Sequence, residues 1–208
     1  LYFMFYAVRT HLRKGRIDMP VYKPEDYEKV LERIQKKTAA LHINMGQCLT
    51  EEEIADFENC HKVKLPQAYR IFLKNIGNGC SRMFEGCRLN ALENSPCQEL
   101  SKPFLLEKFW LWEDDDREYE IIEAEMEEKV YRGNIELINL GCGMSYRLIT
   151  TGKCQGEVWN FTDVGVQPCC ERQDFLGWFE LWLDHQDNTD YFKDYVYDEA
   201  DYHQYSEQ

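Results

Sequence analysis

The sequence predicts an α+β fold in one domain, and three observations support this class. Its 208 residues suffice for one hydrophobic core and are too few for two. Between residues 25 and 76 apolar side chains recur at helical spacing, whereas from about residue 134 they alternate and glycines separate short runs. A last apolar run, at residues 175–184, returns to helical spacing. We therefore expect helices packed around an antiparallel-rich sheet.

The composition is that of a folded chain in water. Hydrophobic residues make up 44% and aromatic residues 14% of the sequence, and no uninterrupted apolar stretch approaches the ~18 residues of a membrane span. Residues 1–21 form a separate N-terminal segment, either docked on the domain or not native to it. Its apolar residues precede its basic ones, the reverse of a secretory signal, so we expect a cytoplasmic protein without membrane contact.

The charge is strongly negative and unevenly distributed. The formal net charge is −14, yet residues 1–50 carry 9 basic and 5 acidic side chains, so the acidity belongs to the rest of the chain. Such a surface repels the phosphates of nucleic acids and attracts cationic partners. We therefore expect no nucleic-acid binding and a protein partner with a basic surface.

Nine cysteines form an odd and irregular set. No CxxC pair is present, and only Cys169 and Cys170 are adjacent, which is a poor geometry for a disulfide. In a chain without a secretory signal this pattern fits reduced thiols, several of them buried as small hydrophobic side chains. The sequence thus predicts no metal and no cofactor.

The first two predicted helices have local signals for their ends. An amphipathic helix is expected at residues 25–42, ended by Gly46. The next helix, at residues 50–60, has Thr50 as its N-cap and Glu53 three residues later, which together form a capping box.

The third predicted helix, at residues 66–76, begins with proline at its first position. The Gly-Asn-Gly triplet at residues 77–79 ends it, because glycine and asparagine tolerate the left-handed conformation. At the other end of the chain, Asp174 is the expected N-cap of the aromatic helix at residues 175–184.

Strands are expected in the middle of the chain. The apolar runs MFEGCRLNAL (residues 83–92) and PFLLEKFWLW (residues 103–112) are interpreted as strands. Farther on, Leu137 and Trp159 belong to successive strands joined by tight turns. The predicted core includes three large aromatic side chains: Phe72, Trp159 and Trp178.

The stretch LGCGMSYRLI, residues 140–149, has three possible interpretations: a phosphate loop, half of a metal site or the bend of a hairpin. A dinucleotide loop would lead into a helix, whereas strand-like YRLIT follows Gly143. Cys142 lacks nearby Cys or His partners for a metal. The hairpin bend, with Cys142 as a buried thiol, is the best interpretation.

An acidic segment separates the two groups of strands. Residues 113–128 contain ten acidic residues and one arginine. We interpret the segment as a turn and a solvent-facing helix whose inner positions are Tyr119, Ile122 and Met126. The chain ends in a second acidic region, the tyrosine-rich extension at residues 184–208, which either packs as a further helix or offers an acidic surface.

Four sequence elements in this order resemble the SMI1/KNR4 group of the SUKH superfamily: EEIADFE at residues 52–58, LPQAYRIFLKNIGNG at 65–79, GCG with GEVW at 141–143 and 156–159, and FLGWFELWL at 175–183. The resemblance covers roughly residues 50–183, and we assign residues 22–183 to this domain. The acidic segment and the C-terminal extension depart from a minimal domain.

The resemblance implies an α+β fold of four to six strands and a role in binding. For bacterial members it implies an immunity protein encoded beside a secreted polymorphic or contact-dependent toxin. For eukaryotic members it implies a regulatory adaptor in cell-wall synthesis.

The sequence contains no recognisable catalytic group. Its five histidines are scattered, none lies in HExxH, and no serine lies in GxSxG. His61 follows Cys60, but neighbouring helix residues point in different directions, so this pair is interpreted as structural. The carboxylates are too numerous to single out a catalytic pair, and we predict that the protein is not an enzyme.

Two functions follow as hypotheses. The first is an intracellular immunity protein that binds and neutralises a cognate toxin through an acidic surface; the alternative is a non-enzymatic regulatory scaffold in cell-wall synthesis or signalling. Because interface hot spots favour aromatic side chains while carboxylates steer a cationic partner, the candidate binding residues lie at the start of the acidic segment. They are Trp110, Trp112, Glu113, Asp114, Asp115, Asp116, Glu118 and Glu120.

Overall fold

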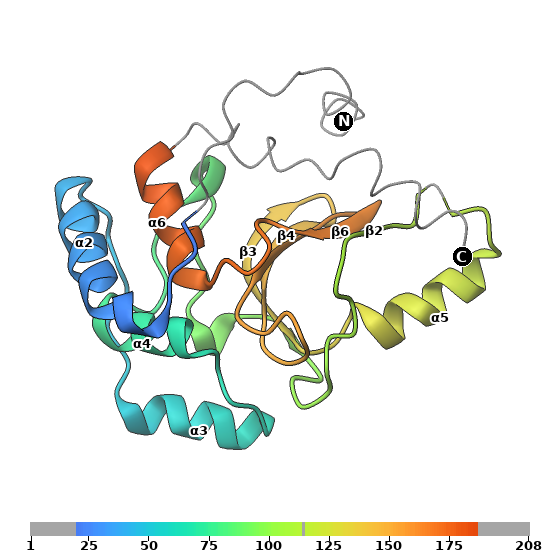
Figure 1. Cartoon of the computed structure of the whole chain (residues 1–208), viewed down its shortest axis with the longest axis horizontal. Helices are drawn as coiled ribbons and strands as arrows, with labels where there is room; N and C mark the ends of the chain where they lie inside the picture. The colour runs from blue at the N-terminus through green and yellow to red at the C-terminus, as the bar shows by residue number, and fades with distance from the viewer. Residues whose placement is uncertain (1–19, 114, 187–208) are drawn as a thin grey trace.

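The computed structural model describes residues 20–113 and 115–186, which form a single α+β domain. Six strands form one antiparallel sheet in the order β1-β3-β4-β5-β6-β2. Helices α2, α3, α4 and α6 gather at one end of the molecule and α5 stands apart at the other (Figure 1). The predicted fold class is confirmed.

The elements have the following bounds. The helices are α2 (Tyr27–Ala40), α3 (Glu51–His61), α4 (Gln67–Asn75), α5 (Tyr119–Lys129) and α6 (Phe175–His185), with short 3-10 turns η2 (Pro24–Asp26), η3 (Phe84–Gly86) and η4 (Leu92–Asn94). The strands are β1 (Cys97–Gln98), β2 (Trp110–Leu111), β3 (Asn134–Gly141), β4 (Met144–Ile149), β5 (Val158–Phe161) and β6 (Gly165–Pro168).

Helix α2 ends before the predicted position. Its last residue is Ala40, and His42 adopts a left-handed conformation with φ 53°. The amide of Ile43 donates to the carbonyl of Thr38, which closes the helix as a Schellman motif. The prediction that Gly46 ends this helix is wrong. Gly46 instead lies against residue 78, whose carbonyl oxygen would be 2.2 Å from an added Cβ.

The predicted caps of α3 and α6 are confirmed. Thr50 Oγ1 accepts a hydrogen bond from the Glu53 amide at 3.2 Å, and the Glu53 carboxylate accepts one from the Thr50 amide at 2.8 Å. Asp174 accepts a hydrogen bond from the Gly177 amide at 3.0 Å. Each of these caps satisfies amides that the first helical turn leaves without a partner.

The tip of the β3–β4 hairpin is the GCG stretch. Gly141, Cys142 and Gly143 have φ values of 81°, 52° and 78°, so the bend uses the left-handed region that glycine adopts readily. The hairpin interpretation is confirmed. The thiol of Cys142, however, is exposed rather than buried, because the side chain of a hairpin tip projects beyond the sheet.

The two central apolar runs are mostly not strands. Residues 83–92 contain η3, η4 and one bridge residue, Leu89, and residues 103–112 contribute only the short strand β2 and a bridge at Phe104. Their apolar side chains are nonetheless buried, as Met83, Phe84 and Leu89 are at most 3% exposed. The core thus receives these side chains from loops, and the strand prediction is wrong over most of both runs.

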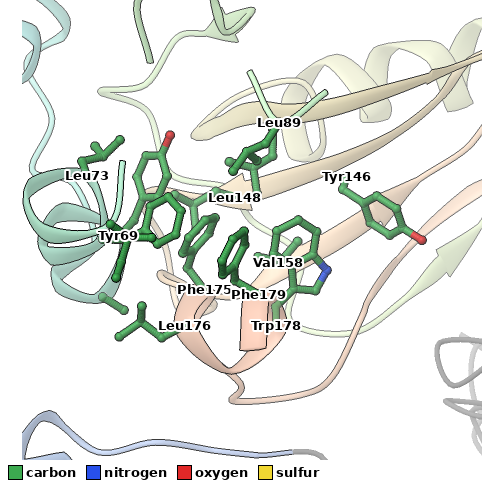
Figure 2. Packing of buried hydrophobic residues seen from close by; sticks show 14 of the residues in the cluster. Tyr69, Leu73, Leu89, Tyr146, Leu148, Val158, Phe175, Leu176, Trp178 and Phe179 are labelled. Carbon is green, nitrogen blue, oxygen red and sulfur yellow. The ribbon is translucent and has the colours of Figure 1, made fainter. Parts of the chain in front are cut away.

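The main core lies between the helices and one face of the sheet. Phe72 of α4 meets Phe175 and Phe179 of α6 edge to face, with ring centroids 4.7 Å apart in both pairs. Figure 2 shows Phe175, Trp178 and Phe179 packed between α4 and the strand residues Leu148 and Val158. Burying each such aromatic ring stabilises the fold by roughly 1.5–3 kcal/mol. Phe72 and Trp178 are fully buried, as predicted.

A smaller core cluster covers the other face of the sheet. Trp159 is fully buried there and meets Phe104 edge to face at 4.9 Å. Phe161 and Val166 complete this face, against which Tyr131, just after α5, also packs. The predicted burial of Trp159 is confirmed, but its ring lies on the opposite face of the sheet from Trp178.

A buried carboxylate connects α2 to α6. Glu180 of α6 is 2% exposed and accepts hydrogen bonds from Arg33 at 2.9 Å, Lys37 at 2.8 Å and the Tyr22 hydroxyl at 2.5 Å. Within the described residues, the side chains of Tyr22, Arg33 and Lys37 thus provide the hydrogen-bond partners of this charge.

Several predictions fall outside the described residues. They concern residues 1–19 of the N-terminal segment, Asp114, and residues 187–208 of the C-terminal extension.

Candidate functional site

The candidate site is the acidic segment at residues 113–128, which connects β2 to α5 and then forms most of that helix. Strand β2 is an edge strand that pairs with β6. Helix α5 projects from the end of the sheet opposite the main helices (Figure 1). The fold therefore presents the acidic segment away from the main core.

The two predicted tryptophan anchors are engaged within the protein. Trp110 and Trp112 are half-buried, pack on the smaller core cluster and meet edge to face at 5.6 Å. The indole nitrogen of Trp112 donates to the carbonyl of Asp163 at 2.8 Å. Both rings thus lie beside the acidic segment, where they hold its first residues against the sheet.

One arginine organises the charges of this segment. Arg117 forms ion pairs with Asp115 at 2.6 Å and with Glu125 at 2.7 Å, and Lys129 also pairs with Glu125. The pKa of Asp115 is lowered mainly by the hydrogen bond from Arg117. The charges of Asp115 and Glu125 are therefore largely compensated at short range.

The remaining carboxylates face solvent. They are exposed and form no ion pair with any described residue: Glu113, Asp116, Glu118, Glu120, Glu123, Glu127 and Glu128. Four of the eight predicted binding residues, Glu113, Asp116, Glu118 and Glu120, belong to this set. Asp115 does not, because Arg117 binds it.

Two large apolar side chains are exposed among these carboxylates. Tyr119 is 67% and Ile121 is 52% exposed, whereas Ile122 and Met126 face the protein. The prediction that Tyr119 belongs to the inner stripe is wrong, because Tyr119 stands at the first position of the helix, a full turn before the buried Ile122. We define the α5 surface as Tyr119, Ile121 and the seven exposed carboxylates.

Sequence reasoning missed Ile121. The pair Ile121–Ile122 carried a usable signal, because adjacent helix residues lie about 100° apart and a stripe one residue wide cannot bury both. A single exposed apolar residue on a surface is common, and here two, Tyr119 and Ile121, are exposed within three residues of this acidic helix.

Of the histidines that the structure describes, His61 is the one nearest in sequence to a cysteine, Cys60, and its ring contacts a phenylalanine and a second cysteine instead. The His61 ring packs at a tilt against Phe57, with centroids 4.3 Å apart, and its Nδ1 lies 3.8 Å from the sulfur of Cys97, a residue of β1. Burial raises the pKa of Cys97, which keeps the thiol protonated and weakly nucleophilic. Among the residues that the structure describes, no cluster of three or more His, Cys, Asp or Glu could hold a metal.

Within residues 20–113 and 115–186, none of the helices has the length and apolar character needed to cross a membrane. Comparison with curated proteins and with solved structures gave no match. A comparison with family models matched residues 48–201 to the SMI1 / KNR4 family (SUKH-1). The match runs from just before α3, through the whole sheet and the α5 surface, past the end of α6. Because it spans well over half of the 208 residues, the chain belongs to the SMI1/KNR4 family.

Proposed function

We propose that this chain is a cytoplasmic immunity protein that binds a cognate protein toxin through the α5 surface and thereby neutralises it. Family membership supports a binding role, since the family is generally non-catalytic. The observation that carries the proposal is the composition of the α5 surface. The surface contains seven exposed carboxylates without ion partners among the described residues and two exposed apolar side chains, Tyr119 and Ile121.

The α5 surface contributes to binding in two ways, one electrostatic and one hydrophobic. The carboxylates attract a cationic partner over distances of about a Debye length, ~8–10 Å at physiological salt, and so accelerate association. Tyr119 and Ile121 stabilise the bound state by losing contact with water, which slows dissociation. A toxin that cuts nucleic acid needs a basic surface to hold phosphate, so an acidic helix can occupy that surface in place of the substrate.

The fixed parts of the site support the same role. Arg117 forms ion pairs with both Asp115 and Glu125. At the start of the segment, the indole of Trp112 donates a hydrogen bond to the Asp163 carbonyl in the β5–β6 turn. The exposed groups thus sit on a segment held at both ends. A surface that is ordered before binding loses less conformational entropy on association.

The experiment is co-expression with the product of the adjacent toxin reading frame. We expect the two chains to co-elute in gel filtration at physiological salt and the toxin to lose its activity in the complex. A matched pair of variants localises the contact: Tyr119→Ala with Ile121→Ala on α5, and Leu41→Ala with Val21→Ala, which are exposed apolar residues near α2.

We expect the α5 pair to release the toxin and the α2 pair to retain it. If the variant that carries Tyr119→Ala and Ile121→Ala still binds the toxin and inhibits it, the interface lies elsewhere. If no toxin is encoded beside the chain and none is inhibited, the regulatory scaffold is the better function.

A further inference from the structure

A second surface, of mixed polarity, lies beside the β1–β3 edge of the sheet. Two adjoining hollows, of about 240 and about 260 Å³, share Arg88 and Asn94 in their walls. The first extends over Asn44 and Ser81, and the second reaches Asn139 near the end of β3. We define these two hollows together as the Arg88 groove. It has no residue in common with the α5 surface.

The walls of the groove are held by the family's Gly-Asn-Gly triplet. Three extended segments lie side by side through the bridges Met45–Cys80 and Cys80–Leu89. Gly79, at φ 80°, permits the close approach, because an added Cβ would lie 2.6 Å from the Leu89 carbonyl oxygen. The triplet therefore ends α4 and also shapes the groove.

Buried polar groups form its floor. Asn90 is 7% exposed, donates its amide to the Leu137 carbonyl at 2.8 Å and its side-chain nitrogen to the Glu136 carbonyl at 3.3 Å. The Glu136 carboxylate is 5% exposed and accepts from Arg147 at 3.0 Å and from Asn139 at 3.2 Å. These bonds fix the floor before any ligand arrives.

Arg88 is the one charge in the walls of the groove that no described residue compensates. Arg88 is exposed and forms neither an ion pair nor a hydrogen bond with any described residue. Arg147 compensates Glu136, the one carboxylate in the walls, whereas Glu93, which accepts a hydrogen bond from the neutral Asn78 amide at 2.7 Å, keeps its charge. A guanidinium offers paired donors that match a carboxylate.

We propose that the Arg88 groove binds an extended peptide segment of a partner protein and that Arg88 pairs with an Asp or Glu side chain of that segment. The exposed side chains of Asn44, Asn94 and Ser81 make no hydrogen bond with the described residues and can donate to and accept from a peptide main chain. Each hollow is smaller than the ~300 Å³ at which pockets for drug-sized molecules begin, and both are open, which suits successive side chains of an extended chain.

This site is independent of the α5 surface and of the proposed toxin. Helix α5 leads into the first residues of β3, whereas the groove reaches Asn139 near the other end of that strand. The α5 surface offers carboxylates without an ion partner among the described residues and the groove offers one such guanidinium, so the two select different partner chemistry.

The test uses the full chain and a displayed library of random dodecapeptides. Selection on the unmodified chain should enrich peptides with an acidic residue at a fixed position. One enriched peptide, and its version with Gln or Asn at that position, are then titrated by calorimetry against the unmodified chain, Arg88→Gln and Arg82→Gln. Arg82 is the matched control, because it is exposed in the same loop and does not line the groove.

We expect Arg88→Gln to weaken the peptide about tenfold or more, as does neutralising the peptide's acidic residue, and the two changes together to have little further effect. Arg82→Gln should change the affinity less than about twofold. The proposal is overturned if selection yields no acidic position, or if Arg88→Gln and Arg82→Gln change the peptide affinity equally. It is also overturned if inorganic phosphate competes with the bound peptide as well as free glutamate does, because Arg88 would then bind any anion. Failure here leaves toxin binding through α5 unaffected, because the two tests share no residue.

Discussion

Glu180 connects α6 to α2 through a buried charge network. Its carboxylate is 2% exposed and meets Arg33, Lys37 and Tyr22, which lie more than 140 residues earlier. Removing one member of a buried charged network leaves the others without compensation, which costs about 3–5 kcal/mol in the interior. Arg33 and Lys37 are partly exposed here, with 45% and 31% of their side chains accessible, so the cost should be lower.

Replacing Glu180 by Gln should therefore destabilise the fold at pH 7 by about 2–3 kcal/mol, because the amide keeps the volume and loses the charge. Urea unfolding followed by far-UV circular dichroism measures the change. The control is Glu32→Gln, an exposed glutamate on α2 without a described ion partner. Equal unfolding midpoints for the two variants would contradict the assignment.

The stability difference between the original chain and Glu180→Gln should depend on pH. Burial raises the pKa of Glu180, but hydrogen bonds from Arg33, Lys37 and Tyr22 outweigh it and bring the pKa down to about 2. A lowered folded-state pKa means that the stabilisation is complete above the unfolded-state pKa of roughly 4.3 and is lost as the pH falls toward 2. The stability difference between the original chain and Glu180→Gln should therefore narrow below about pH 4. A difference that stays constant from pH 7 to pH 3 would show that the charge is not responsible.

At the scale of elements, two glycine turns allow the cost of backbone strain to be distinguished from the cost of steric crowding. Gly79 and Gly141 have nearly the same φ, 80° and 81°, but an added Cβ meets the Leu89 carbonyl oxygen at 2.6 Å in the first and nothing within 4 Å in the second. Gly141→Ala should cost about 1–2 kcal/mol, the strain of a left-handed residue, and Gly79→Ala about 1–3 kcal/mol more. Urea midpoints of the two variants test this order. If Gly141→Ala is the more damaging change, the hairpin tip and not the Gly-Asn-Gly triplet is the constrained turn.

The α5 helix makes a prediction about association. Asp116→Asn, Glu118→Gln and Glu120→Gln together remove three exposed charges without an ion partner among the described residues. We expect slower toxin association and a weaker dependence of that rate on salt, with stability within about 0.5 kcal/mol of the original, because solvated charges contribute little to folding. Stopped-flow binding at two salt concentrations provides the measurement.

The control for this experiment carries the same change of charge at the other end of the molecule. Glu25, Glu28 and Glu32 are exposed on η2 and α2, away from α5 (Figure 1). Replacing all three by Gln should alter association much less than the α5 triple. If both triples slow association equally, the overall net charge steers the partner and α5 has no special role. Asp115 is omitted because its neutralisation would also release Arg117.

The whole molecule is organised around one sheet with a core cluster on each face. Trp178 and Phe175 lie on the helical face, whereas Trp159 and Phe161 lie on the other. Strands β4 and β5 contribute alternate side chains to both, so neither cluster can lose its packing while the other keeps its strands.

We therefore predict one cooperative unfolding transition. Phe175→Leu and Phe161→Leu should each lower the urea midpoint, by the equivalent of about 1–2 kcal/mol, while fluorescence and far-UV circular dichroism still report the same midpoint. A second transition in Phe161→Leu alone would show that the smaller cluster unfolds separately. The matched substitutions compare the two faces with the same loss of volume.

The predictions that held rest on interactions within a few residues of the chain. The capping box of Thr50 and Glu53, the Asp174 cap and the hairpin bend at residues 141–143 are confirmed, because such hydrogen bonds and φ requirements are set by neighbours in sequence. The burial of Ile122 and Met126 in an otherwise acidic helix follows from helical spacing in the same way.

The sequence by itself thus determined the fold class, the family, most helix ends and the acidic character of α5. The tertiary structure alone decided which apolar runs become strands, since residues 83–92 reach the core as turns against partners such as Trp178 and Tyr146. It also decided which of 38 acidic side chains is buried and paired, as Glu180 is, and which remain exposed on α5. The physical reason is that burial, ion pairing and the coverage of a ring depend on residues that lie far apart in the sequence, and local patterns carry no record of those contacts.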